Sequence, residues 1–152
     1  MSLESVRSFF AEHAPEIAVL VTEASSATVP LAAEAHGVAP EQIAKTICLR
    51  VGDTIMLIVS GGMARLDNRK FKDRFGGKAR MLDAEQVVEV TSHPVGGVCP
   101  FGLPGSLPIY CDVSLRAFDE VVPAAGAINA AVRINPERMA RLVDAQWVDV
   151  CQ

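Results

Sequence analysis

The sequence has 152 residues, a net charge of −4 and 50% hydrophobic residues. This length predicts a single domain over residues 1–152, and the composition is that of a globular protein and excludes a disordered chain. Apolar runs stay shorter than the ~18 residues of a membrane span, and no basic segment followed by an apolar stretch opens the chain. We therefore expect a cytoplasmic globular protein with no membrane partner, in which the four scattered cysteines are reduced.

Helix caps, glycines and apolar periodicity predict helices and strands mixed along the chain. Helices are expected over 3–13, 30–36, 67–75, 84–90, 115–121 and 136–145, with one helical turn over 40–44. Strands are expected over 17–22, 45–51, 54–60, 79–82, 108–113, 128–134 and 147–151. Because hairpins alternate with helices in place of regular βαβ units, the predicted class is α+β, with a curled, barrel-like mixed sheet surrounded by helices.

The segment Gly96–Pro104 combines three glycines and two prolines with apolar residues. Surface loops usually mix Gly and Pro with Asn, Asp and Ser. Glycine permits close backbone approach and proline fixes φ, so we expect a rigid, partly buried loop that closely approaches another group. That group is either a ligand carbonyl, phosphate or oxyanion held by backbone N–H groups, or another strand that crosses the loop.

Half of the 14 Lys and Arg residues lie between Arg65 and Arg80, in a chain that is acidic overall. Such a local basic stripe is typical either of one polyanion contact or of a solvated helix face. Lys45 is the polar member of a strand face that also carries Ile43, Ile47 and Leu49. Its ammonium group either extends to the rim of the core or points into a cleft toward a phosphate or ribose.

Several common kinds of site have no signature in this sequence. Zinc-ligand spacing, the GxSxG element, the P-loop and the dinucleotide-binding glycine motif are all missing, so we expect no metal and no cofactor. His93 is the one histidine that precedes the glycine loop closely. Asp112 ends an apolar strand just after the loop, where it either caps the next turn or belongs to a site.

Several motifs, in order and in matching spacing over nearly the whole chain, point to a known family. They are Thr28 with His36-Gly37-Val38, Ile43-Ala44-Lys45-Thr46, the basic segment 70–77, Thr91 with Gly96–Gly102, Pro108–Asp112, and Gly126–Asn129. In these motifs the sequence resembles the YbaK/prolyl-tRNA synthetase-associated editing domains, free-standing proteins that hydrolyse mischarged aminoacyl-tRNA. Cys99 replaces a serine common in that family, and Leu20-Val21-Thr22 lacks the aromatic or histidine residue that members often carry there.

The resemblance implies roles for individual residues. Lys45 would contact the 3′-terminal nucleotide of the acceptor end, and the loop from Gly96 to Pro100 would line the aminoacyl pocket. The residues expected to act on the ester are Lys45, Gly97, Val98 and Cys99. The expected substrate-binding residues are Thr46, Gly96, Pro100, Phe101, Gly102, Asp112, Gly126 and Ala127. The expected tRNA-binding residues are Arg65, Arg69, Lys70, Lys72 and Arg74.

The expected function is therefore deacylation of a mischarged tRNA, either tRNA-Pro or a related tRNA that carries a small amino acid such as Ala, Ser or Cys. Aminoacyl-tRNA is the expected partner, and an aminoacyl-tRNA synthetase is a candidate second partner. A non-catalytic module that binds tRNA or a synthetase is the alternative. A general nucleic-acid-binding protein fits less well with an acidic chain that has one Trp and one Tyr. A metal hydrolase lacks its ligand spacing.

Overall fold

A mixed β-sheet forms the centre of the computed structural model, which describes residues 2–152. Five strands lie in the order β4, β2, β3, β5, β8, and a sixth, β6, pairs with the start of β2. Their bounds are β2 (Ile43–Val51), β3 (Thr54–Gly61), β4 (Arg80–Met81), β5 (Ile109–Asp112), β6 (Val122–Pro123) and β8 (Gln146–Val148). The sheet does not close into a barrel, and β1 (Leu20–Val21) forms a separate antiparallel pair with β7 (Ala130–Ala131). The predicted α+β class with a mixed sheet is confirmed.

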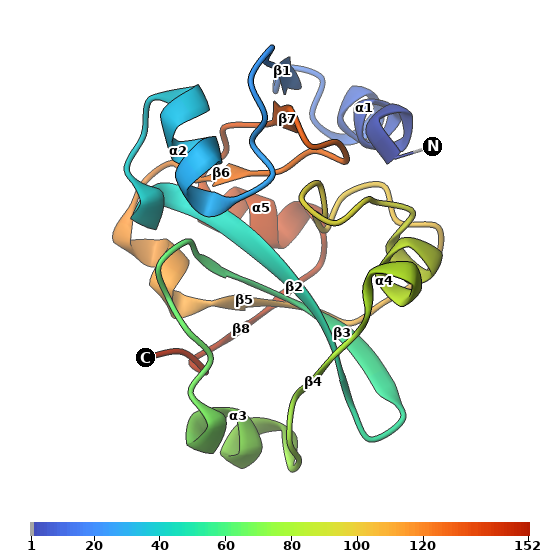
Figure 1. The fold of residues 1–152 in the computed structure, drawn as a ribbon, viewed down its shortest axis with the longest axis vertical. Helices are drawn as coiled ribbons and strands as arrows, with labels where there is room; N and C mark the ends of the chain where they lie inside the picture. Colours follow the sequence, from blue (N-terminus) through green and yellow to red (C-terminus); the bar gives the residue numbers. More distant parts are fainter. Residues whose placement is uncertain (1) are drawn as a thin grey trace.

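The helices lie around this sheet (Figure 1). They are α1 (Ser2–His13), α2 (Val29–His36), α3 (Asn68–Phe75), α4 (Ala84–Thr91) and α5 (Pro136–Leu142), with short 3₁₀ helices η1 (Pro40–Gln42) and η2 (Val113–Ala117). The Thr28 hydroxyl accepts a hydrogen bond from Leu31 N, and Asp83 forms a reciprocal cap with Gln86. These caps satisfy N–H groups that a helix leaves unpaired at its start, which is why the sequence predicted these boundaries well.

The hairpin of β2 and β3 turns at Gly52, whose φ of 58° favours glycine, and it is packed on both faces. Alternate side chains serve different clusters: Cys48 and Leu57 belong to the large core on what we call the near face. Leu49 and Ile58 belong to a second core on the far face, which α3 covers. Figure 1 shows α3 and the C-terminus below the sheet, with α1, α2 and the β1–β7 pair above it.

The predicted helix over 115–121 is wrong. Asp112 caps a short 3₁₀ helix that ends at Ala117, and the chain then runs extended, with Val121 bridged to Ile134. Val121 and Val122 are buried, and β-branched residues followed by proline favour extension over a helix. The strands predicted over 17–22 and 128–134 shrink to two residues each. Within residues 2–152, every helix is too short or too polar to cross a membrane.

Candidate functional site

A cavity of about 290 Å³ opens on the near face, between β2 and the glycine loop. The start of α2, strands β6 and β7, and the segment from β4 to α4 supply its other walls. The lining is mostly aliphatic, with hydroxyl groups from Ser26, Thr28 and Thr46. Thr28, Met81 and Val95 are exposed and mark its mouth, whereas Ala44 and Cys48 are buried. A small concave site of mostly apolar lining with few polar groups is the usual form of a ligand site.

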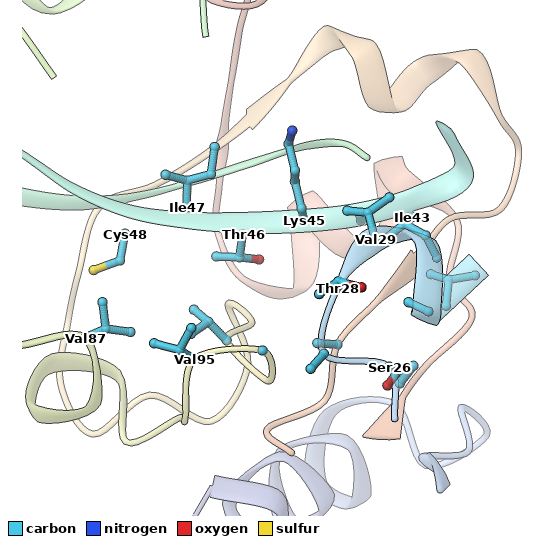
Figure 2. Close-up of a pocket in the computed structure, with 18 of the residues that line it drawn as sticks. Ser26, Thr28, Val29, Ile43, Lys45, Thr46, Ile47, Cys48, Val87 and Val95 are labelled. Carbon is cyan, nitrogen blue, oxygen red and sulfur yellow. The ribbon is translucent and has the colours of Figure 1, made fainter. Parts of the chain in front are cut away.

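The alternation of β2 decides which of its side chains meet the cavity. Figure 2 shows Thr46 and Cys48 on the side of β2 that faces Val87 and Val95. The Thr46 hydroxyl oxygen is buried and has no hydrogen-bond partner among residues 2–152. Burial raises the pKa of the Cys48 thiol, so this sulfur is neutral near pH 7 and is a poor nucleophile. The cavity therefore offers a neutral hydroxyl and no thiolate.

Lys45 contributes to the cavity wall, but its ammonium group points the opposite way. In Figure 2 the side chain extends from the other side of β2, together with Ile47. Its Nζ donates a hydrogen bond to the carbonyl oxygen of Ala64. Burial lowers the pKa of this amine, with a further decrease from Arg65 and an opposing contribution from Cys151. The sequence left open whether the Lys45 ammonium group extends to the rim of the core or points into a cleft. In the structure this group does not point into the cavity.

The glycine loop closely approaches other segments of the chain. A Cβ added at Gly97 would lie 2.6 Å from the backbone nitrogen of Ala127, and Gly126 N donates to Gly97 O at 2.9 Å. Gly96 has a φ of 94° and packs against Ala27. The glycines are thus required by tight chain crossings, and these crossings place Gly96 and Val98 on the cavity.

The other loop residues support the loop from behind. Cys99 is completely buried, and burial raises the pKa of its thiol to about 12, so the thiol is neutral at physiological pH. Phe101 is also buried, with its ring centroid 4.7 Å from that of Phe10. Pro100 and Gly102 line a separate groove beside α1. Four predicted site residues therefore line the cavity: Lys45, Thr46, Gly96 and Val98. The four residues that follow Val98, from Cys99 to Gly102, do not line it.

Comparison with known proteins decides the family. The sequence profile of the aminoacyl-tRNA editing domain matches residues 23–142. This chain belongs to the aminoacyl-tRNA editing domain family. It is 46% identical to the uncharacterized protein YwhH of Bacillus subtilis (strain 168), over all of this chain and 98% of that protein. It is 33% identical over 115 residues to the proline–tRNA ligase of Shouchella clausii (strain KSM-K16), which covers 73% of this chain and 20% of the ligase.

A solved structure supports the same assignment. It superposes with a TM-score of 0.91 and 31% identity, covering 99% of this chain and 97% of the other. That protein is suggested to be a trans-editing enzyme for prolyl tRNA synthetase. The editing-domain fold that the motifs implied is thereby confirmed.

Asp112 lies on the far face of the editing domain, away from the cavity lining. Its side chain is buried, and its two oxygens accept hydrogen bonds from Val150 N and Ser114 N, each at 2.9 Å. Ser114 in turn accepts from Gly61 N at 3.0 Å. The carboxylate therefore ties β5 to the C-terminal segment and to the end of β3. Gly126 and Ala127 lie in the turn that packs against Gly97, and their substrate-binding role stays a prediction.

The basic residues of the editing domain also belong to the far-face side. Arg69 and Lys72 are exposed on α3. Lys70 Nζ bonds to Asp149 at 3.1 Å and to the carbonyl oxygen of Cys151 at 2.9 Å, and the hydrogen bond to Asp149 raises the lysine pKa. The Arg74 guanidinium lies 4.9 Å from the centroid of the Phe75 ring. Arg65 is exposed just before α3. The tRNA-binding role of these residues remains a prediction.

Sequence reasoning missed much of the cavity wall. Val29, Ala32, Cys48, Val122 and Ala131 all line it, and none was predicted as a site residue. Alternation along the strand could have identified Cys48, two residues after Thr46. The contribution of Val122 and Ala131 depends on the pairing of distant segments, which a single sequence does not show.

Proposed function

We propose that this editing domain hydrolyses the ester of a mischarged aminoacyl-tRNA, with tRNA-Pro, or a related tRNA, bearing a small amino acid as its substrate. The observation that carries the proposal is the near-face cavity, which is small, apolar and walled by the family's lysine strand and glycine loop. Two relatives support the choice of tRNA: one is a proline–tRNA ligase, and the other is suggested to be a trans-editing enzyme for prolyl tRNA synthetase. We place the activity in the cytoplasm, with a synthetase as a candidate partner.

The size of the cavity suits a site that hydrolyses wrong aminoacyl esters after the synthetase has formed them. A synthetase pocket discriminates against an amino acid smaller by one methylene by only ~1–3 kcal/mol, so fidelity requires later hydrolysis of the wrong ester. A cavity of about 290 Å³ admits a small aminoacyl group. The nucleotide carries the phosphodiester chain, so it remains at the mouth near Thr28 and Val95. A site of this kind selects its substrate by the size and chemistry of the amino-acid side chain that enters the cavity.

The reaction requires little from the protein beyond positioning. A water oxygen attacks the ester carbonyl carbon, the bond to the ribose oxygen breaks, and that oxygen takes up a proton, releasing the amino acid and an uncharged tRNA. Because Cys48 and Cys99 hold neutral thiols, we assign attack to water. Gly97 N already donates to Pro94 O at 2.8 Å, so we assign the neighbouring amide of Val98 to the carbonyl oxygen.

Lys45 is the proposed anchor of the terminal nucleotide. Its amine is held by one neutral carbonyl, and a phosphate is a stronger acceptor for an ammonium group. The lysine stem is a flexible chain of four methylene groups, and we propose that it turns the amine from Ala64 to the rim of the cavity when the nucleotide binds. Single-turnover deacylation of Ala-, Ser- and Cys-tRNA tests this assignment. We expect Lys45→Ala to abolish hydrolysis while the unfolding temperature stays close to that of the wild type.

The matched control is Arg141→Ala, which removes one exposed positive charge from α5. This variant should retain full activity. Full activity in Lys45→Ala would refute the anchoring role. If the wild type binds tRNA but hydrolyses none of the three esters, the chain is a binding module and the proposed function is wrong.

A further inference from the structure

The unpaired hydroxyl of Thr46 carries information about which amino acid the cavity accepts. Three buried side-chain polar atoms have no partner among residues 2–152: His36 Nε2, His93 Nδ1 and Thr46 Oγ1. Only Thr46 of these three belongs to the cavity lining. Buried polar atoms without a partner cost free energy, and they are uncommon in folded proteins. A ligand group that bonds to Thr46 would remove this cost.

The position of Thr46 fixes the depth at which such a group would lie. Thr46 is in β2, between buried Ala44 and buried Cys48 on the cavity side of the strand. A β-branched residue in a paired strand has a restricted χ1, so the hydroxyl is held in place. Figure 2 shows the oxygen on the side of Thr46 toward Thr28, which lies at the mouth. A group that enters past Thr28 therefore approaches the side of Thr46 that carries the oxygen.

The charge of the lining restricts the chemistry of that group. Among the described residues, the cavity lining includes no Asp or Glu, and its one cationic residue, Lys45, turns its amine to the other side of β2. Burying an ammonium or carboxylate group there would leave a charge unpaired, which is far more costly than burying a neutral group. The α-ammonium group of the substrate therefore stays near the solvated mouth. The partner of Thr46 is a neutral group that both donates and accepts hydrogen bonds.

We propose that Thr46 selects esters of β-hydroxy amino acids, seryl above all, over the alanyl ester that differs from seryl by one oxygen atom. This inference rests on the proposed function, because it assumes that an aminoacyl group occupies the cavity. The serine hydroxyl is a neutral group that both donates and accepts hydrogen bonds, so it can supply the partner that the Thr46 hydroxyl lacks. A cysteine thiol is a weaker donor and acceptor, so it is a poorer match.

The other lining hydroxyls are less suited to this role. Ser26 Oγ already donates to Ile128 O at 3.2 Å, and Thr28 Oγ1 accepts from Leu31 N at 3.3 Å as the cap of α2. Their hydrogen bonds maintain the fold. A site that binds a substrate hydroxyl rejects the analogue that lacks it, because its own polar group is then left unpaired. Thr46 is consequently the residue at which seryl and alanyl esters should be distinguished.

The test compares kcat/KM for Ser-tRNA-Pro and Ala-tRNA-Pro in the wild type, Thr46→Val and Thr46→Ser. Valine keeps the shape of threonine and removes the oxygen. We expect the wild type to prefer the seryl ester by about tenfold or more. Thr46→Val should lose that preference while its alanyl rate stays within about threefold of wild type. Thr46→Ser should keep the preference, because the hydroxyl remains. The matched control is Ser26→Ala, which removes a hydroxyl that is already paired and should leave the ratio unchanged.

Each possible outcome leads to a definite conclusion. Equal wild-type rates on the two esters, or equal losses on both in Thr46→Val, would overturn the inference and leave the proposed function intact. A ratio that shifts in Ser26→Ala as much as in Thr46→Val would also overturn it. Hydrolysis of neither ester by the wild type would overturn the proposed function, and the inference with it. Thermal unfolding of each variant shows whether a lost rate reflects lost folding.

Discussion

The two faces of the sheet differ in how their polar groups are used. On the far face, Asp112 accepts two backbone hydrogen bonds, and Lys70 holds the C-terminal segment through Cys151 O. On the near face, the cavity contains Thr46, whose hydroxyl has no partner among the described residues. Strand β2 belongs to both faces at once. The far face therefore holds β2 in place, whereas the near face leaves one hydroxyl group of β2 unpaired among the described residues.

This comparison separates residues that a sequence motif treats alike. Lys45 and Thr46 are neighbours in the chain, yet they point to opposite faces (Figure 2). Lys45 is the exception on the far face, because we propose that its amine anchors the terminal nucleotide. A change at a far-face residue that supports the fold, such as Asp112, should alter stability without altering which ester is preferred. A change on the near face should alter rate or preference. Three variants test this division.

The largest effect on stability is expected from Asp112→Ala on the far face. The substitution leaves Val150 N and Ser114 N without their buried acceptor. We expect a loss of about 4 kcal/mol in the free energy of unfolding, because two hydrogen bonds to a charged carboxylate are lost and each contributes ~1.5–3 kcal/mol. Urea denaturation measures it, with Asp119→Ala, an exposed carboxylate, as the control. A loss below about 1 kcal/mol, or a changed seryl-to-alanyl ratio in the folded fraction, would contradict the division between faces.

A smaller loss of stability and a large loss of activity are expected from Gly97→Ala on the near face. The added Cβ would meet the backbone of Ala127 at 2.6 Å, which neither segment can relieve by a side-chain rotation. We expect a cost of about 2 kcal/mol and a deacylation rate at least about tenfold lower, since the loop that carries Val98 is displaced. Gly105→Ala is the control, because nothing lies within 4 Å of its added Cβ. Wild-type activity in Gly97→Ala would show that the loop position is not critical.

Local signals explain which parts of the fold were predictable from the sequence. The caps at Thr28, Asp67 and Asp83, and the turn at Gly52, act within a few residues, so the elements beside them were located correctly. The helix predicted over 115–121 failed because long-range pairing of Val121 with Ile134 overrode the local pattern. Short strands such as β6 and β7 owe their existence to such pairings.

The candidate site was predictable only in part, for a related reason. Alternation correctly grouped Lys45 with Ile47 and Leu49, but it gives only the relative side of each residue. Both faces of β2 are covered, so the sequence could not indicate which face borders the cavity. A motif likewise does not separate a residue that lines a site from one that supports it. Val98 lines the cavity, whereas Cys99 beside it is completely buried.

The smallest effect is expected from substitutions on the basic surface of α3. This surface is connected to the cavity mouth along one edge of the sheet. Helix α3 leads into β4, the edge strand of the sheet, and Met81 of β4 lies at the mouth of the cavity. With the aminoacyl group in the cavity, we expect the acceptor stem outside the mouth to follow this edge from the near face to Arg69 and Lys72. These two residues are suitable targets because their side chains are exposed, whereas Lys70 also ties down the C-terminal segment.

We expect the double substitution Arg69→Ala, Lys72→Ala to weaken tRNA binding and to reduce the slope of log K against log salt by about one for each lost phosphate contact. The seryl-to-alanyl ratio should stay unchanged, because phosphate contacts do not sense the aminoacyl group. Arg141→Ala, which removes a positive charge from α5, is the control and should leave the slope unchanged. Titrations at several salt concentrations measure both quantities. An unchanged slope in the double variant would show that Arg69 and Lys72 of α3 do not contact the tRNA. The acceptor stem would then have to contact other residues around the cavity mouth.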